Sequence, residues 1–149
     1  MKCTSPAAVP WEVMSQAPEV FEVEIAVQPG DIDQMGHVNN VVYVRWIQEA
    51  ATAHWTAAAS IQDQASLLWV VVRHEIDYLR PAMPGDTILA RTWVGQASRI
   101  KFERFVELLR ASDRGALARA RTVWCPIDSG TGKPVAVSAE VRERFSAVV

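Results

Sequence analysis

Five segments of the chain alternate between hydrophobic and polar residues, and this period of two predicts β-strands. The first segment covers residues 20–28, and the other four cover residues 67–80, 86–95, 98–110 and 115–128. The side chains expected to share one face of the first strand are Phe21, Val23, Ile25 and Val27, opposite Glu22 and Glu24, and those expected to share one face of the second are Leu68, Val70, Val72, His74, Ile76 and Tyr78. In the fourth strand they are Ile100, Phe102, Val106 and Leu108, opposite Lys101, Glu103 and Glu107. In the fifth strand they are Ala116, Ala118, Ala120 and Thr122, opposite Arg119 and Arg121.

Between residues 38 and 60 the pattern changes to the period of a helix. The apolar face of this helix is made by Tyr43, Trp46, Ile47, Ala50 and Ala57, and the polar face by Arg45, Gln48 and Thr52. Alanine is the best helix former, and a stripe of small residues lets the helix lie close to its neighbour. A second, short helix is expected in residues 138–145, with Ser138 as its N-cap.

The first residues are expected to form an irregular arm, residues 1–19, because Pro6, Pro10 and Pro18 interrupt any helix there. Trp11 of this arm is expected to dock on the body of the protein. Residues 20–149 then form a single domain, since 149 residues favour one hydrophobic core.

The order of elements predicts the fold class. One strand and a long helix precede four strands joined mostly by short turns, and such turns favour an antiparallel sheet. We therefore expect an α+β fold, in which a curled five-stranded sheet wraps around one helix. A single helix covers only one face of such a sheet, so we also expect a homodimer or homotetramer.

Composition and charge exclude several other functions. Half of the residues are hydrophobic and 21% are charged, as in a packed globular protein, and the net charge of −2 without a basic block argues against nucleic-acid binding. No run of apolar residues is long enough for a signal peptide or a membrane span. Cys3 and Cys125 match no metal spacing, and together these features predict a soluble, cytoplasmic protein without a metal.

Small polar residues gather just before the long helix, in "GDIDQMGHVNN". Asp33 is suited either to cap a turn or to act as a catalytic carboxylate, and the spacing alone leaves the two about even. Asn39 and Asn40 are good capping residues, and Asp31 fits an irregular turn. His37 is either a structural histidine or a group that orients the carboxylate or a water molecule.

The segment "DIDQMGHVNNVVYVRWIQEA" resembles the signature of hotdog-fold acyl thioesterases of the 4-hydroxybenzoyl-CoA thioesterase type, in the branch that includes plant acyl-ACP thioesterases and bacterial acyl-CoA thioesterases. "VVVRHEIDYLRPAMPGDTI" and "ARARTVWCPIDSGTGKP" are similar to later strands and turns of that family. The resemblance covers residues 21–145. It implies hydrolysis of an acyl-CoA or acyl-carrier-protein thioester, with coenzyme A as part of the substrate and no further cofactor.

The resemblance also implies roles for individual residues. Asp33 is expected to act as nucleophile or general base, with His37 as a positioning residue and the backbone N–H of Asn40 facing the thioester carbonyl. The free N–H groups and the positive dipole end of a helix suit that oxyanion. Further substrate contacts are expected from Asn39 and, along the acyl chain, from Tyr43, Trp46 and Ile47. Glu49 is expected either to contact the substrate or to pair with Arg45. Ser98, Arg99 and Lys101 form a basic turn that is expected either to bind the phosphates of coenzyme A or to face solvent.

The sequence departs from the known branches at Pro29, Met35, Asn40 and Gln48, so the mechanistic detail of neither branch transfers completely. His54 and His74 lie on predicted apolar faces, where a hydrogen-bonded core histidine is the default. Two other functions remain open. A hotdog hydratase or dehydratase is expected to carry a His-Phe-Pro or Asp-x-Asn-x-x-His motif, which this sequence lacks. A non-catalytic acyl-CoA-binding module is the other alternative.

Overall fold

The computed structural model describes residues 19–145, and its elements follow the predicted order. They are β1 (Phe21–Ala26), the 3-10 turn η2 (Pro29–Asp31), α1 (Asn40–Ala58), α2 (Ile61–Ser66), β2 (Leu67–Tyr78), β3 (Thr87–Ala97), β4 (Phe102–Arg110), β5 (Ala116–Asp128) and α3 (Ala139–Arg144). Ser138 caps α3 as predicted, because its hydroxyl accepts the N–H of Val141 at 3.2 Å. The predicted arm, with Trp11, lies outside the described residues except for its last residue.

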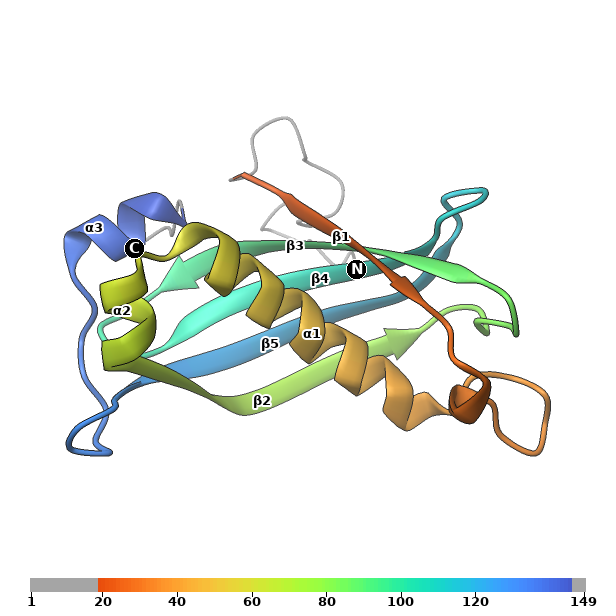
Figure 1. Cartoon of the computed structure of the whole chain (residues 1–149), viewed down its shortest axis with the longest axis horizontal. Coiled ribbons are helices and arrows are strands. Elements are labelled where there is room, and N and C mark those ends of the chain that lie inside the picture. Colours follow the sequence, from red (N-terminus) through yellow and green to blue (C-terminus); the bar gives the residue numbers. More distant parts are fainter. Residues whose placement is uncertain (1–18, 146–149) are drawn as a thin grey trace, which may run out of the picture.

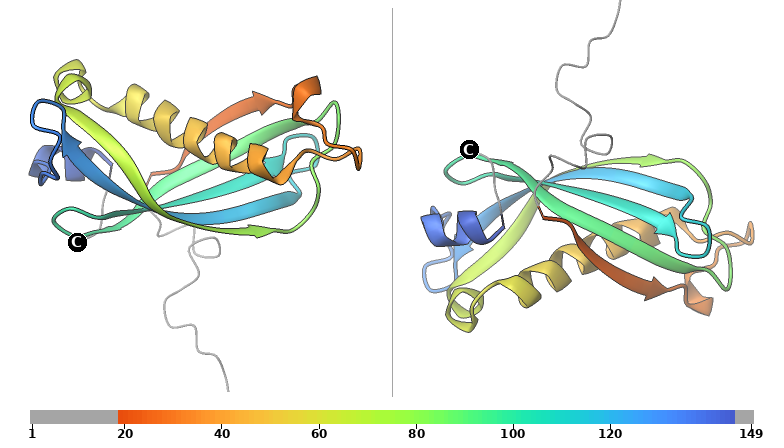
Figure 2. Two further views of the ribbon diagram at one scale, coloured as in Figure 1. Left: turned by 90° about the horizontal axis from the view of Figure 1, so that it is seen from below. Right: turned by 90° about the horizontal axis from the view of Figure 1, so that it is seen from above.

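The five strands form one antiparallel sheet in the order β1-β3-β4-β5-β2. The sheet curls, and α1 runs along one of its faces (Figures 1 and 2). This is the expected α+β architecture. The order leaves β1 and β2 as the two edge strands, of which β2 is twice as long.

The apolar face of α1 packs into the main core. Tyr43, Trp46, Ile47 and Ala50 are each at most 2% exposed, and two of the small side chains predicted for β5, Ala118 and Ala120, lie in the same core. Ala57 was expected on this face, but it is exposed. The last turn of the helix packs instead through Trp55 and Ala58 against a second cluster that includes Phe102 and Phe145.

The predicted single face of β2 is wrong, because a bulge at Val72 interrupts the strand. Val71 lies opposite Trp124 and Arg73 opposite Val123, so Val72 has no partner in β5. Such an extra residue reverses the alternation. Leu68, Val70 and Val72 are therefore about half exposed, at 55%, 48% and 54%, whereas the half-buried side chains are those of Leu67, Trp69 and Val71 before the bulge and of His74 and Ile76 after it.

The start of the fourth strand and one short helix also differ from the prediction. The fourth strand begins at Phe102 rather than Ser98, because Ser98 and Lys101 close a tight turn through a 2.8 Å hydrogen bond from Ser98 N–H to Lys101 C=O. The helix α2 was not predicted, and Ser60 caps it through the N–H of Asp63. No helix in the described part of the chain is long and apolar enough to cross a membrane.

Candidate functional site

The polar segment before α1 folds into a small hairpin. Ile32 and Val38 form an antiparallel bridge, and the N–H of Asp33 donates to the carbonyl of His37 at 2.8 Å. Gly36 closes the turn with a φ of +80°, a conformation that glycine adopts without strain. The hairpin therefore holds Asp33 and His37 side by side, both half-buried, just ahead of the first residue of α1.

The carboxylate of Asp33 is fixed by its own loop. Its Oδ1 accepts the N–H of Met35 at 2.8 Å and the N–H of His37 at 3.3 Å. Within residues 19–145, Oδ2 accepts no hydrogen bond. Asp33 thus has the turn-capping role that its spacing allowed, and it keeps one oxygen for a further partner.

Asp31 has a different environment from Asp33. It is 5% exposed, accepts the N–H of Gln28 at 2.8 Å and pairs with the guanidinium of Arg45 at 3.1 Å. This hydrogen bond to Asp31 is the main reason that the pKa of Arg45 is raised. Asp31 therefore ties the loop to α1, in agreement with the structural role predicted for it.

The start of α1 is held by two side chains. Asn39 is the N-cap, and its side chain accepts the N–H of Val41 at 3.1 Å. The hydroxyl of Tyr78, at the end of β2, donates to the carbonyl of Asn40 at 3.1 Å. Asn40 is the exposed first helical residue, and N–H groups of a first turn have no acceptor within their own helix. Asp33, His37, Asn39 and Asn40 are thus brought together in one loop and helix start.

The residues predicted to contact the acyl chain lie in the core. Tyr43, Trp46 and Ile47 are nearly or fully inaccessible, and the Tyr43 hydroxyl accepts the N–H of Ala82 at 2.8 Å. Burial raises the pKa of Tyr43. Their contact with substrate stays a prediction. Glu49 pairs with Arg45 at 3.2 Å, which is the structural alternative stated for it.

The predicted basic turn lies at the other end of the molecule from Asp33, where β3 leads into β4 (Figure 1). Ser98 and Lys101 line an open groove of about 710 Å³ together with Arg73 and Arg121. The carbonyls of Ser98 and Arg99 accept hydrogen bonds from Arg142 at 2.8 and 3.4 Å. The groove carries three cationic side chains, but Arg73 pairs with Glu75, and Arg121 pairs with Glu75 and Glu103. Its contact with the phosphates of coenzyme A stays a prediction.

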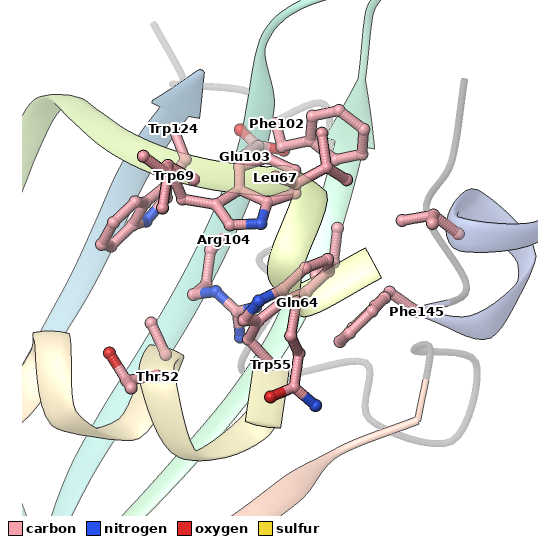
Figure 3. Close-up of a pocket in the computed structure, with 14 residues that line it drawn as sticks. Thr52, Trp55, Gln64, Leu67, Trp69, Phe102, Glu103, Arg104, Trp124 and Phe145 are labelled. Carbon is pink, nitrogen blue, oxygen red and sulfur yellow. The ribbon is translucent and has the colours of Figure 1, made fainter. Parts of the chain in front are cut away.

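A second, more enclosed cavity of about 340 Å³ lies beside the C-terminal half of α1 and was missed by the sequence analysis (Figure 3). Its walls are aromatic, with one polar side. The lining residues are Ala51, Thr52, Trp55, Gln64, Leu67, Leu68, Trp69, Val94, Phe102, Glu103, Arg104, Trp124, Val141 and Phe145. One signal in the sequence marks it: Arg104 occupies an inward position between Phe102 and Val106.

Arg104 bridges the sheet and the helix beside this cavity. One of its terminal nitrogens contacts His54 Nδ1 at 3.0 Å and donates to Thr92 Oγ1 at 2.9 Å. Burial lowers the pKa of Arg104 to about 10, so it remains charged at neutral pH. Burial, with a contribution from Arg104, lowers the pKa of His54 to about 3, so the imidazole is neutral and its Nδ1 accepts. His54 is thus the hydrogen-bonded core histidine predicted, whereas neither ring nitrogen of His74 has a partner among residues 19–145.

Comparison with known proteins identifies the family. The sequence profile of the Thioesterase-like superfamily matches residues 27–145, which include the hairpin, α1 and both cavities. The chain belongs to the Thioesterase-like superfamily. The sequence identity to the individual members described next is low.

Two curated proteins illustrate that distance. The long-chain acyl-CoA thioesterase FadM of Escherichia coli is 27% identical over 132 residues, covering 87% of this chain and 99% of that protein. The chloroplastic acyl-acyl carrier protein thioesterase ATL3 of Arabidopsis thaliana is 24% identical over 132 residues, covering 85% of this chain and 68% of that protein.

A solved structure confirms the fold. Slr0204, a 1,4-dihydroxy-2-naphthoyl-CoA thioesterase from Synechocystis, matches with a TM-score of 0.75 at 24% identity, covering 86% of this chain and 96% of that chain. The thioesterase-like chain therefore has the expected hotdog fold.

Proposed function

We propose that this protein hydrolyses acyl thioesters of coenzyme A or acyl carrier protein to a free acid and a thiol. The observation that carries the proposal is the position of Asp33, in a rigid hairpin directly ahead of the N-terminus of a buried helix. Membership of the thioesterase-like family and the names of the two curated relatives support the same activity.

The proposed chemistry uses two neighbouring groups. The carboxylate of Asp33, through Oδ2, attacks the thioester carbonyl or removes a proton from an attacking water molecule. The N–H of Asn40 and the positive end of α1 stabilise the negative charge that develops on the carbonyl oxygen. The carbon–sulfur bond then breaks, and the thiolate leaves and takes up a proton. On the nucleophilic route, water then hydrolyses the anhydride between the acyl group and Asp33 and releases the free acid. His37, in the same hairpin, orients the carboxylate or the water molecule.

The complete site is proposed to need a second copy of the chain. The long edge strand β2 exposes Leu68, Val70 and Val72, and an unpaired edge with apolar side chains favours pairing with another strand. Antiparallel pairing centred on the middle of β2 would place its first residue, Leu67, opposite Tyr78 of the second copy. Because Tyr78 holds the start of α1, the helix start of one copy would lie beside the aromatic cavity and the basic groove of the other.

The activity is tested by release of free thiol from a panel of acyl-CoA esters. We expect an Asp33→Asn variant to lose at least about a hundredfold in kcat, the usual contribution of a catalytic acid or base. Its thermal stability should be unchanged, because the asparagine oxygen still accepts the N–H groups of Met35 and His37.

Asp31→Asn is the matched control. It weakens the pair with Arg45, so we expect a lower melting temperature but a kcat within a fewfold of the parent. Full activity in Asp33→Asn would exclude the proposed role of Asp33. Binding of acyl-CoA without thiol release would favour the non-catalytic module instead, a function that the turn-capping role of Asp33 also allows.

A further inference from the structure

The cavity beside α1 contains a buried positive charge without a counterion. Arg104 is 8% exposed, and within residues 19–145 it forms no ion pair. One of its nitrogens binds His54 and Thr92, which are both neutral, and the remaining guanidinium N–H groups have no acceptor there. A buried charge is costly unless an opposite charge or hydrogen bonds compensate it. Arg104 therefore lacks the anion that its position requires.

The acidic residue in the cavity wall does not supply that anion. Glu103 follows Phe102 on β4, and adjacent residues of a strand point to opposite faces. Its carboxylate binds the guanidinium of Arg121 at 2.5 Å and the N–H of Gln96 at 3.1 Å. A counterion for Arg104 would therefore come from outside the described part of the chain.

The rest of the cavity fits an apolar body. Rings of Trp55, Trp69, Phe102 and Phe145 line it, and several of them pack edge to face or stacked on one another. The side chain of Arg104 leaves the sheet toward α1, where Thr52 and Trp55 form the opposite wall (Figure 3). The indole N–H of Trp69 is a further donor without an acceptor among the described residues.

We propose that this cavity binds an organic carboxylate with an apolar body, and that Arg104 is its counterion. An aromatic ring or short alkyl chain lies against the tryptophan and phenylalanine rings that line the cavity, and the carboxylate accepts hydrogen bonds from the free guanidinium N–H groups. A cavity of about 340 Å³ is at the small end of ligand pockets and suits a molecule of this size. The binding itself does not depend on the proposed hydrolysis.

Two kinds of molecule supply a carboxylate with an apolar body. One is the far end of an acyl group whose other end is the thioester, as in the CoA ester of a dicarboxylic acid. α1 rises about 1.5 Å per residue, so Thr52 lies about 18 Å along the helix from Asn40. This is too far for a short acyl group whose thioester lies at the start of α1 in the same copy. Only the helix start of a second copy would bring such an acyl group within reach of the cavity. The other source is a free carboxylic acid, such as a reaction product.

Calorimetric titration of the full chain with three compounds of the same shape tests the binding. The probes are 3-phenylpropionate, 3-phenylpropan-1-ol and 3-phenylpropylamine. We expect the acid to bind at least about tenfold more tightly than the alcohol, because its hydrogen bonds to Arg104 are charge-assisted, and the amine to bind least. Acid and alcohol of equal affinity, or no binding of the acid, would overturn the proposal.

Two pairs of variants locate the charge. Arg104→Met should raise the Kd of the acid at least about tenfold and leave that of the alcohol unchanged, whereas Arg80→Met, which removes an exposed arginine just beyond the far end of β2, should change neither. Thr52 is an exposed helix residue at the cavity wall, so Thr52→Glu is expected to fold, and its new carboxylate should compete with the acid for Arg104. Thr52→Gln is its uncharged control. If Arg104→Met does not fold, equal acid affinity of Thr52→Glu and Thr52→Gln would still overturn the proposal.

Hydrolysis of adipoyl-CoA and hexanoyl-CoA distinguishes the two sources. These acyl groups have the same number of carbons, and only the first has a distal carboxylate. A higher kcat/KM for adipoyl-CoA that disappears in Thr52→Glu but not in Thr52→Gln assigns the cavity to the acyl group. Equal rates with retained acid binding assign it to a free acid. If neither these esters nor any other tested ester releases thiol while the acid still binds, the proposed function fails and the carboxylate site stands.

Discussion

Two aspartates separated by one residue differ in burial and in partners. Asp31 is buried against Arg45 and a backbone N–H, whereas Asp33 is half-buried and closes the hairpin with one oxygen only. The sequence predicted a turn role for Asp31, because Pro29 and Gly30 mark an irregular loop, but it predicted neither the burial of Asp31 nor its pair with Arg45. It did not predict Arg104 as a cavity residue. An inward-facing arginine is visible in the strand pattern, but the tryptophans that complete its surroundings come from three other elements.

At the residue scale, His54 makes stability depend on pH. Its pKa is about 3 in the folded protein, because burial and Arg104 disfavour the imidazolium, and 6.5 in an unperturbed histidine. Between these two pH values the unfolded chain binds a proton that the folded chain does not, so the free energy of unfolding falls as the pH is lowered through this window.

We therefore expect the urea midpoint of the parent to fall more between pH 7 and pH 5 than that of His54→Asn. Asparagine does not titrate, and its side-chain oxygen offers Arg104 an acceptor in place of Nδ1. Between pH 7 and pH 9 the two proteins should change in parallel. An equal fall of both midpoints from pH 7 to pH 5 would show that His54 titrates normally.

At the element scale, α1 was the most predictable part of the chain. Its period, its buried face and its cap at Asn39 all follow from local sequence, and its ends agree with the prediction within two residues. The interruption of β2 was not predictable, since six apolar residues in a row, Leu67 to Val72, fit either phase of a strand. Pairing with β5 selects the phase, and that is a tertiary contact.

The N-cap of α1 gives a stability prediction. Asn39→Ala removes the acceptor for the N–H of Val41, and we expect a loss of about 1 kcal/mol in the free energy of unfolding, measured with urea. Asn39→Asp keeps the acceptor and should retain most of the stability. Because Asn39 is exposed, lost packing does not contribute. Equal stability of all three proteins would exclude a capping role.

At the scale of the whole molecule, the order of elements was sufficient to predict the antiparallel sheet around one helix. Short turns left few alternatives for β3, β4 and β5, and the row of alanines on β5 marked the surface that faces the helix. The order also left β2 at an edge with an exposed apolar stripe, which supports the proposed second copy.

Val72→Lys tests that assembly. A lysine on an edge strand disfavours strand pairing, and in the proposed dimer it would lie near Arg73 of the second copy. We expect light scattering to show a shift from dimer to monomer, with a fall in kcat/KM. Ile61→Lys, on the exposed face of α2, is the matched control, because this side chain is 86% exposed and does not belong to the edge strand. A parent that is monomeric, or a Val72→Lys variant that remains dimeric, would contradict the proposed assembly.

The bulge at Val72 gives insertions and deletions an unusual meaning in this strand. Removing this one residue would make Val71 and Arg73 neighbours, and because they already pair with the consecutive residues Trp124 and Val123, both halves of the strand would keep their present faces. Trp69 would stay in the cavity, and only the half-exposed side chain of Val72 would be lost. In an alignment of related chains, a one-residue gap here would therefore mark the loss of the bulge and not a change of the residues that face the cavity.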